Sequence, residues 1–103
     1  DFRVHLRPES FLPIILAHAG YAVYTAEAYV AASECANIYL EPSWSTIHDL
    51  LWLVPKLGCE RIMFGSDLPP NLPVELCKYR SLNLSPEQLE TCLSGTAARV
   101  FKL

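Results

Sequence analysis

Short apolar runs alternate along the chain with stretches of helical periodicity. The apolar runs are residues 13–20 (PIILAHAG), 37–43 (NIYLEPS) and 61–67 (RIMFGSD). Each is only a few residues long and apolar on both faces, which is typical of a parallel strand buried beneath helices. The pattern therefore predicts three strands. The last of them, residues 61–67, is the third apolar run.

Helix signals follow each of these runs. Residues 25–36 (TAEAYVAASECA) are rich in alanine and favour a helix. After the second run, Ser45 is expected to cap a helix that bends at Pro55 and stops at Gly58. The apolar residues at helical spacing in that stretch are Ile47, Leu50, Leu51, Val54 and Leu57. Residues 73–79 predict another short helix.

The carboxyl-terminal stretch carries its own cap signals. Ser85 and Gln88 in SPEQ form the pattern of a capping box, with Pro86 at the first helical position. TAARVFKL predicts a last helix capped by Thr96. The order strand, helix, strand, helix, strand, helix, helix predicts an α/β fold with parallel strands covered by helices.

A sheet of only three parallel strands would have two open edges. Its unpaired backbone groups would favour self-association unless further strands covered them. The sequence also begins without Met, in DFRVHLRPE. We therefore expect residues 1–103 to be one domain that is a fragment of a larger one, completed by a missing segment or by a second copy.

Composition narrows the choice of partners and compartment. The chain has 103 residues, of which 51% are hydrophobic and 18% charged, and a net charge of -3. It has no basic stripe for nucleic acid or an anionic membrane. The longest uncharged stretch, residues 10–26, is interrupted by Pro13, His18 and Gly20, which argues against a membrane span or a signal peptide. We expect a cytoplasmic protein.

The four cysteines agree with a reducing compartment. They are Cys35, Cys59, Cys77 and Cys92, and no two of them form a CxxC pair. A structural zinc site is therefore not predicted. The pattern indicates buried thiols.

A polar residue lies near the carboxyl end of each apolar run. His18 follows PIILA, Glu41 follows NIYL and Asp67 follows RIMFGS. In α/β sheets and barrels the carboxyl ends of parallel strands meet at one edge, where catalytic groups collect. His18 and Asp67, each flanked by small residues, are therefore predicted to converge on one metal ion or one water molecule.

Each of these residues also has a plainer interpretation. A histidine after a strand is often a hydrogen-bonded rim residue, and Asp67 before Leu-Pro-Pro could be a turn residue. Their matching positions favour function for both. Glu41 is expected instead to pair with a helix, and His5 and His48 to be structural or solvated. Trp44 and Tyr21 could line a pocket or pack between helices.

Four segments together resemble a known family. PIILAHAGY, NIYLEPSW, LGCERIMFGSDLPP and LSPEQLETCLSGTAARVFKL are similar to the carboxyl-terminal part of the amidohydrolase-related proteins (amidohydrolase 2), which are metal-dependent TIM barrels. In that family a histidine ends the sixth strand and an aspartate in a phrase such as FGSD ends the eighth. The resemblance implies a partial (β/α)8 TIM barrel, about the last three β/α units plus a carboxyl-terminal helix. Thr96 stands where the family commonly shows Asn.

The resemblance also implies a chemistry. Asp67 would ligate a divalent metal, zinc, and accept a proton from the attacking water, while His18 would hold that water or the substrate. The substrate would be a small carbonyl or carboxylate compound, undergoing amide, ester or lactone hydrolysis or nonoxidative decarboxylation. The family's first-strand HxH pair and fifth-strand histidine have no counterpart here, and His5 lies too close to His18 to replace them. The fragment alone should therefore catalyse little.

Two other interpretations remain open at the level of sequence. The first is a TatD-like metal-dependent deoxyribonuclease, which also ends its last strand on an acidic residue. The acidic net charge and the lack of Lys and Arg clusters count against it. The second is a non-catalytic α/β fragment that acts as an interaction module.

Overall fold

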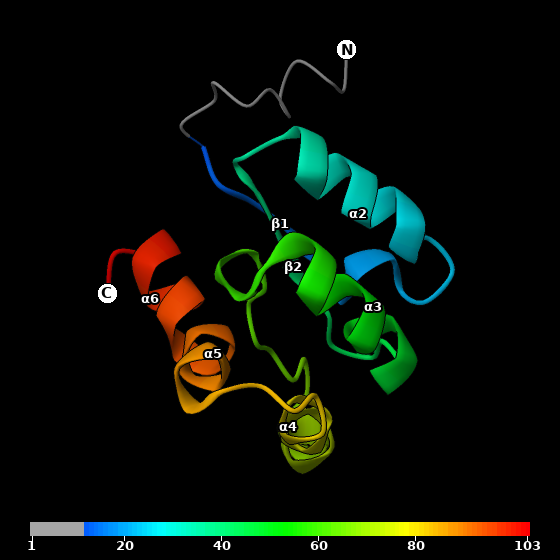
Figure 1. The fold of residues 1–103 in the computed structure, drawn as a ribbon, viewed down its shortest axis with the longest axis vertical. Helices are drawn as coiled ribbons and strands as arrows, with labels where there is room; N and C mark the ends of the chain where they lie inside the picture. Colours follow the sequence, from blue (N-terminus) through cyan, green and yellow to red (C-terminus); the bar gives the residue numbers. More distant parts are fainter. Residues whose placement is uncertain (1–11) are drawn as a thin grey trace.

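The computed structural model describes residues 12–103, which form a short parallel sheet and helices around it (Figure 1). Strands β1 (Ile14–Ala17) and β2 (Ile38–Glu41) pair in parallel, so that the first residues of the two strands face each other and so do the last. Helix α2 (Thr25–Glu34) connects them. The predicted strand-helix-strand unit is therefore confirmed. His5 lies outside the described residues.

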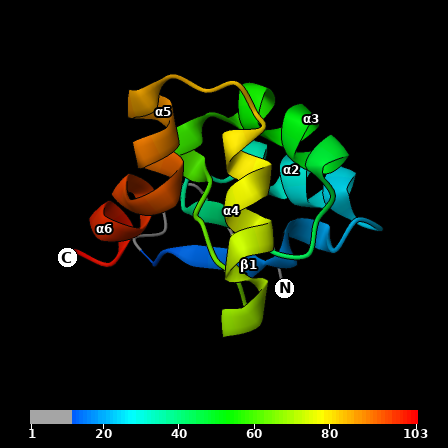
Figure 2. The same cartoon turned by 90° about the horizontal axis from the view of Figure 1, so that it is seen from below.

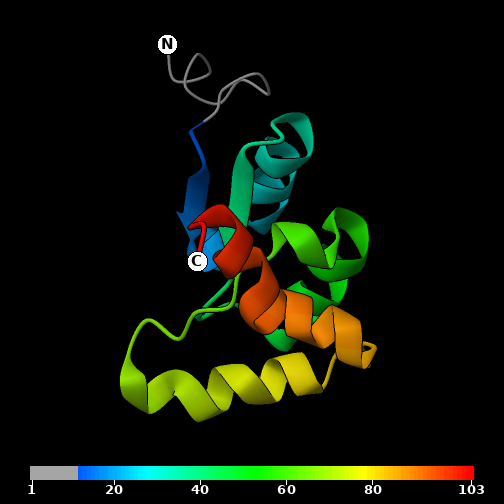
Figure 3. The same cartoon turned by 90° about the vertical axis from the view of Figure 1, so that its left-hand side faces the viewer.

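The remaining helices follow in the predicted order. They are α3 (Ile47–Leu57), α4 (Leu72–Arg80), α5 (Pro86–Glu90) and α6 (Thr96–Val100), with 3-10 turns at His18–Gly20, Cys59–Arg61 and Pro69–Asn71. Figure 2 shows α4 between α5 on one side and α3 on the other. A π-helical stretch, Thr91–Gly95, joins α5 to α6, and the three run on as one helical rod (Figure 3).

The third apolar run departs from the prediction, because it is not a regular strand. It makes a single parallel bridge, between Ile62 and Leu40. The amide of Met63 donates to the carbonyl oxygen of Leu40 at 2.8 Å, but the next amide, that of Phe64, donates to the carbonyl oxygen of Cys92 in the π-helical stretch at 3.0 Å. The run therefore keeps the predicted parallel direction but turns from the sheet to the terminal helix after one bridge.

The hydrophobic core lies between one face of the sheet and the helices. The sheet face that carries Ile38 and Leu40 is the one that packs in the core. The fully buried residues of the core include Ile38, Leu40, Ile62, Leu50 and Leu53. Helix α2 contributes through Ala28 and Ala32. Small residues on α2 allow this helix to approach the sheet closely, which explains the alanine-rich sequence.

Two predicted caps are wrong, for a common reason. The hydroxyl of Ser45 donates to the carbonyl oxygen of His18 at 3.1 Å, so Thr46 caps α3 instead, in a capping box with Asp49. Thr96 begins α6 without capping it, because its hydroxyl donates to the buried carbonyl oxygen of Cys59 at 2.9 Å. The predicted capping box of Ser85 is confirmed. The hydroxyls of Ser45 and Thr96 thus form tertiary hydrogen bonds instead of capping helices.

The four cysteines differ in burial. Cys59 and Cys92 are buried as expected, but Cys35 is half-buried and Cys77 is exposed, so the prediction of buried thiols is wrong for Cys77. Burial raises the pKa of Cys92, and its contact with Cys59 adds to the effect.

Within residues 12–103, no helix has both the length and the apolar character needed to cross a bilayer.

Candidate functional site

The carboxyl ends of the three apolar runs share an unusual backbone conformation. His18, Trp44 and Asp67 lie at or next to these ends, and all three have positive φ, at 65°, 67° and 65°. Positive φ is uncommon for residues other than glycine, and each instance costs about 1–3 kcal/mol when the conformation is sparsely populated. Such strain gathers at active sites, where surrounding contacts maintain it. Asn83 and Lys102, away from this end, also have positive φ, so the conformation alone does not define a site. Together with the predicted positions of His18 and Asp67, it makes this end of the sheet the candidate site.

His18 is oriented by Ser43, which lies in the loop after β2. The ring Nδ1 is 3.0 Å from the Ser43 hydroxyl oxygen and 3.2 Å from the Ser43 carbonyl oxygen. Because a carbonyl oxygen only accepts, Nδ1 carries the proton in this arrangement. In the neutral imidazole, Nε2 then presents a lone pair. Tyr21 packs edge-on against the ring, with the two ring centroids 5.4 Å apart.

Glu41 holds Ser43 in place and links the first two runs. Its Oε2 accepts from the Ser43 hydroxyl at 3.0 Å and from the His18 amide at 3.4 Å, and its Oε1 accepts from the Ser43 amide at 2.9 Å. The Ser43 hydroxyl donates to Glu41 and so accepts from His18. Glu41 was expected to pair with a helix, and that expectation is wrong. Its position at the end of β2, in register with Ala17 immediately before His18, was the signal for this role.

Asp67 is held by Trp44. The indole Nε1 of Trp44 donates to Asp67 Oδ2 at 2.9 Å, and the Asp67 side chain is exposed. The following amide, of Leu68, donates to the carbonyl oxygen of Ser66. Within residues 12–103, Asp67 Oδ1 makes no hydrogen bond. The carboxylate therefore has one fixed oxygen and one that can receive a ligand.

The adjacent residues Ser43 and Trp44 connect the two predicted site residues, His18 and Asp67. Ser43 contacts His18 and its neighbour Trp44 contacts Asp67, although His18 and Asp67 form no hydrogen bond with each other in the described part of the chain. Trp44 therefore supports a site residue rather than the packing of two helices. His48 is exposed, as expected.

Sequence reasoning did not identify Glu75, a buried carboxylate on α4. It is 1% exposed, and its Oε2 accepts from the Trp44 amide at 3.0 Å. The same oxygen forms an ion pair with Lys78, with an N to O distance of 2.8 Å. Glutamate in a helix is usually solvated, so no sequence signal distinguished Glu75.

The side chains of His18 and Asp67 carry atoms of the kinds that bind metal ions. Imidazole nitrogen and carboxylate oxygen are typical zinc ligands, and His18 Nε2 and Asp67 Oδ1 are atoms of these kinds without a hydrogen bond in residues 12–103. Among those residues, no three His, Cys, Asp or Glu side chains are grouped so that they could hold a metal. His18 and Asp67 therefore fit part of a metal donor set.

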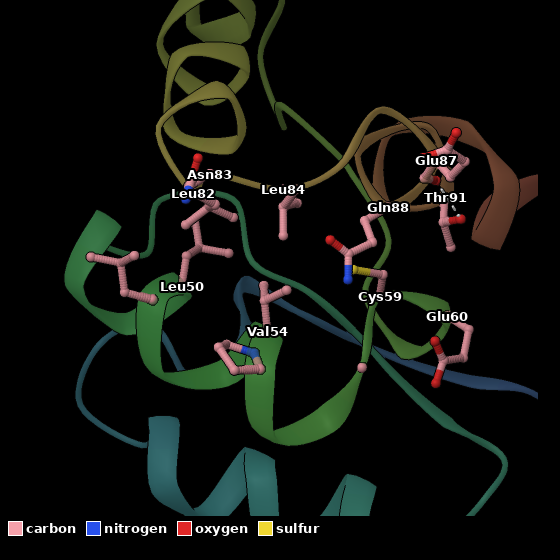
Figure 4. Close-up of a pocket in the computed structure, with 13 residues that line it drawn as sticks. Leu50, Val54, Cys59, Glu60, Leu82, Asn83, Leu84, Glu87, Gln88 and Thr91 are labelled. Carbon is pink, nitrogen blue, oxygen red and sulfur yellow. Dashed lines mark hydrogen bonds between the residues drawn. The ribbon is translucent and has the colours of Figure 1, made fainter.

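A cavity of about 490 Å³ lies elsewhere, between α3, the turn before the third apolar run, and α5 (Figure 4). Leu50 and Val54 line one side, and Cys59, Glu87 and Gln88 line another. Because the turn at Cys59 precedes the third run, this cavity is near the amino end of that run. His18 and Asp67 do not line it. The cavity is separate from the candidate site.

Comparison with known proteins agrees with the sequence resemblance. The family model described as amidohydrolase matches residues 7–103, so the chain belongs to the amidohydrolase family. This match supports membership of a hydrolase superfamily. The search of curated proteins found no match.

Proposed function

We propose that this chain supplies part of the active site of a metal-dependent hydrolase, in which Asp67 and His18 act on one attacking water. The observation that carries the proposal is the pair of adjacent residues Ser43 and Trp44, which hold the imidazole and the carboxylate respectively. Family membership and the positive φ values of His18 and Asp67 support it.

Asp67 is the proposed metal ligand and general base. Trp44 fixes Oδ2, and Oδ1 is left to bind the metal and to accept a proton from the water. An exposed position suits this role because substrate must reach the same point. A zinc ion, when bound, lowers the pKa of water toward about 7 and polarises a carbonyl group.

His18 is proposed to orient the water or to complete the metal ligands. With Nδ1 donating to Ser43, the Nε2 lone pair can accept a hydrogen bond from the water and direct its oxygen toward the substrate. The backbone amide of His18 contacts Glu41, so both ends of this residue are fixed. Removing its side chain should therefore reduce the rate more than it weakens metal binding.

The remaining ligands are proposed to come from outside this chain, either from a missing amino-terminal barrel half or from a second copy. The chain would then be the last three β/α units of a (β/α)8 TIM barrel. The proposed substrates are small carbonyl or carboxylate compounds. Hydrolysis of an amide, ester or lactone is proposed as the reaction, with nonoxidative decarboxylation, a lyase activity, as the alternative.

The test compares Asp67→Asn and His18→Asn in the full gene product that carries this chain. Asparagine tolerates positive φ, so both variants should keep the backbone. We expect Asp67→Asn to lose both turnover and bound zinc, and His18→Asn to lose rate while retaining most of the metal. The exposed His48→Asn is the matched control. Wild-type turnover in Asp67→Asn would overturn the proposal.

The reaction class needs its own measurement. The zinc-loaded wild type is offered a panel of amides, esters and lactones and, separately, aromatic carboxylic acids. Release of an amine, alcohol or ring-opened acid identifies hydrolysis, and release of carbon dioxide identifies decarboxylation. Carbon dioxide release without any hydrolysis would replace the proposed reaction with the alternative.

A further inference from the structure

Glu75 is a buried charged group that three donors share. Its Oε2 accepts from the Trp44 amide at 3.0 Å, from the Asn71 side-chain amide at 2.9 Å and from the Lys78 ammonium at 2.8 Å. A buried carboxylate is costly unless it is paired and hydrogen-bonded. The three donors all serve Oε2, while Oε1 is buried without a hydrogen-bond partner in residues 12–103, so Glu75 depends on these three contacts. The role proposed above for Asp67 does not account for it.

The donors connect Glu75 to both sides of Asp67. The Asn71 side chain also donates to the carbonyl oxygen of Ser66, the residue immediately before Asp67, at 3.0 Å. Trp44, whose amide donates to Glu75, donates through its indole to Asp67 itself at 2.9 Å. One carboxylate on α4 therefore holds both the backbone that precedes Asp67 and the side chain that contacts it.

Lys78 extends the same connection to the loop after β2. Its ammonium donates to the carbonyl oxygen of Ser45 at 2.6 Å as well as to Glu75. Trp44 is thus held by its own amide and by its neighbour's carbonyl. Because Trp44 has a positive φ, contacts of this kind are needed to maintain its conformation.

We propose that Glu75 is a positioning residue that fixes Trp44 and thereby the direction of the Asp67 carboxylate. The functional consequence rests on the role proposed above for Asp67, but the hydrogen-bond arrangement does not. Glu75 touches neither substrate nor water in this account. It acts through Trp44 and Asn71, much as groups hydrogen-bonded to metal ligands orient those ligands in other proteins.

The direct test is the indole signal of Trp44 in a proton–nitrogen correlation spectrum of the full gene product. Trp44→Phe removes the Trp44 signal and so identifies it, and Trp52→Phe identifies the signal of the other tryptophan of this chain in the same way. Asp67→Ala gives the signal position of an indole that has lost its carboxylate partner. We expect Glu75→Gln to move the Trp44 signal toward that position, because the neutral amide lacks the charge that pairs with Lys78 and holds three donors on one oxygen.

Activity supplies the second readout. We expect Glu75→Gln to lower kcat by about 10–100-fold with a smaller change in KM, the range seen for groups that orient metal ligands. Glu87→Gln, an exposed glutamate on α5, is the matched control and should change neither the Trp44 signal nor kcat. A folded Glu75→Gln protein with an unmoved Trp44 signal would overturn the proposal.

A further variant covers the case in which Glu75→Gln does not fold. Asn71→Ala removes the link between Glu75 and Ser66 while leaving the buried ion pair in place. It should also move the Trp44 signal, and an unmoved signal would count against the proposal. If the signal moves while Asp67→Asn retains full turnover, the positioning by Glu75 stands and the proposed function fails.

Discussion

Gly65 lies directly against Glu41. A Cβ atom added to Gly65 would be 2.5 Å from Glu41 Oε1 and 2.8 Å from its Cδ. A side chain at residue 65 would therefore have to displace the Glu41 side chain from its present position. The contact places Glu41 where it meets Ser43 and the His18 amide.

We predict that Gly65→Ala disturbs the site. The new methyl group must displace the Glu41 carboxylate, which breaks its hydrogen bonds to Ser43 and His18. We expect a loss of about 1–3 kcal/mol in the free energy of unfolding, measured by urea denaturation.

Gly95→Ala is the matched control for Gly65→Ala. At Gly95 the φ and ψ angles are -60° and -45°, and the nearest atom to an added Cβ is 3.7 Å away. This substitution should stabilise the protein by about 0.4–1 kcal/mol, because alanine restricts the unfolded chain and suits a helix. If both variants had the same stability, the close approach of Gly65 to Glu41 would be contradicted.

Arg61 joins the end of α2 to β2, and we predict that Arg61→Lys destabilises the fold. Its Nη2 donates to the carbonyl oxygens of Ala32 and Cys35 at 2.7 Å and 2.9 Å, and its Nε donates to that of Ile38 at 3.1 Å. Lysine cannot reproduce this planar set of donors. We expect a loss of about 1.5–3 kcal/mol in urea denaturation.

Arg80→Lys provides the comparison for Arg61→Lys. Arg80 is exposed at the end of α4, and its side chain makes no hydrogen bond within residues 12–103. Its replacement should change the free energy of unfolding by less than about 0.5 kcal/mol. Equal effects of the two substitutions would show that the carbonyl contacts of Arg61 contribute little.

Tyr79 predicts a dependence of stability on alkaline pH. Its hydroxyl is buried without a hydrogen-bond partner in residues 12–103, and burial raises its pKa, with Cys92, Glu41 and Glu75 adding to the effect. Tyrosine in the unfolded chain ionises near pH 10, so above about that pH the unfolded state binds fewer protons than the folded state. This contribution to stability is present below pH 10 and is lost as the pH rises through the folded pKa.

Tyr79→Phe tests this assignment. Because it removes an unpaired buried hydroxyl, it should leave stability at pH 7 unchanged or raise it by about 1 kcal/mol, and it should weaken the alkaline loss. Urea denaturation at neutral and alkaline pH measures both effects, with the exposed Tyr24→Phe as the control. A loss above about 1 kcal/mol at pH 7 would mean that the hydroxyl is hydrogen-bonded in the folded protein.

The elements that sequence predicted well are those fixed by local patterns. Apolar runs and alanine content located β1, α2 and β2, and the spacing of leucines located α3. The third apolar run has the same local pattern, but its amide at Phe64 bonds to the carbonyl of Cys92 in a π-helical stretch. That partner is distant in sequence, so no local rule could exclude a full strand.

Two residues of the candidate site were predicted from the sequence and two were not. His18 and Asp67 were identified because parallel strands bring their carboxyl ends together, which is a property of the fold class. Ser43 and Glu75 could not be identified, because serine and helical glutamate are common on surfaces. Their roles depend on contacts with residues far away in the chain. The metal role of His18 and Asp67 stays a prediction.

The measurement that tests the central claim most directly is paramagnetic broadening by cobalt in the full gene product. If Asp67 and His18 belong to one metal site, adding Co²⁺ should broaden the Trp44 indole signal strongly, because Trp44 Nε1 is 2.9 Å from Asp67 Oδ2. The Trp52 signal should broaden less, and Asp67→Asn should reduce the effect on Trp44. An unbroadened Trp44 signal at saturating Co²⁺ would contradict a metal site at Asp67.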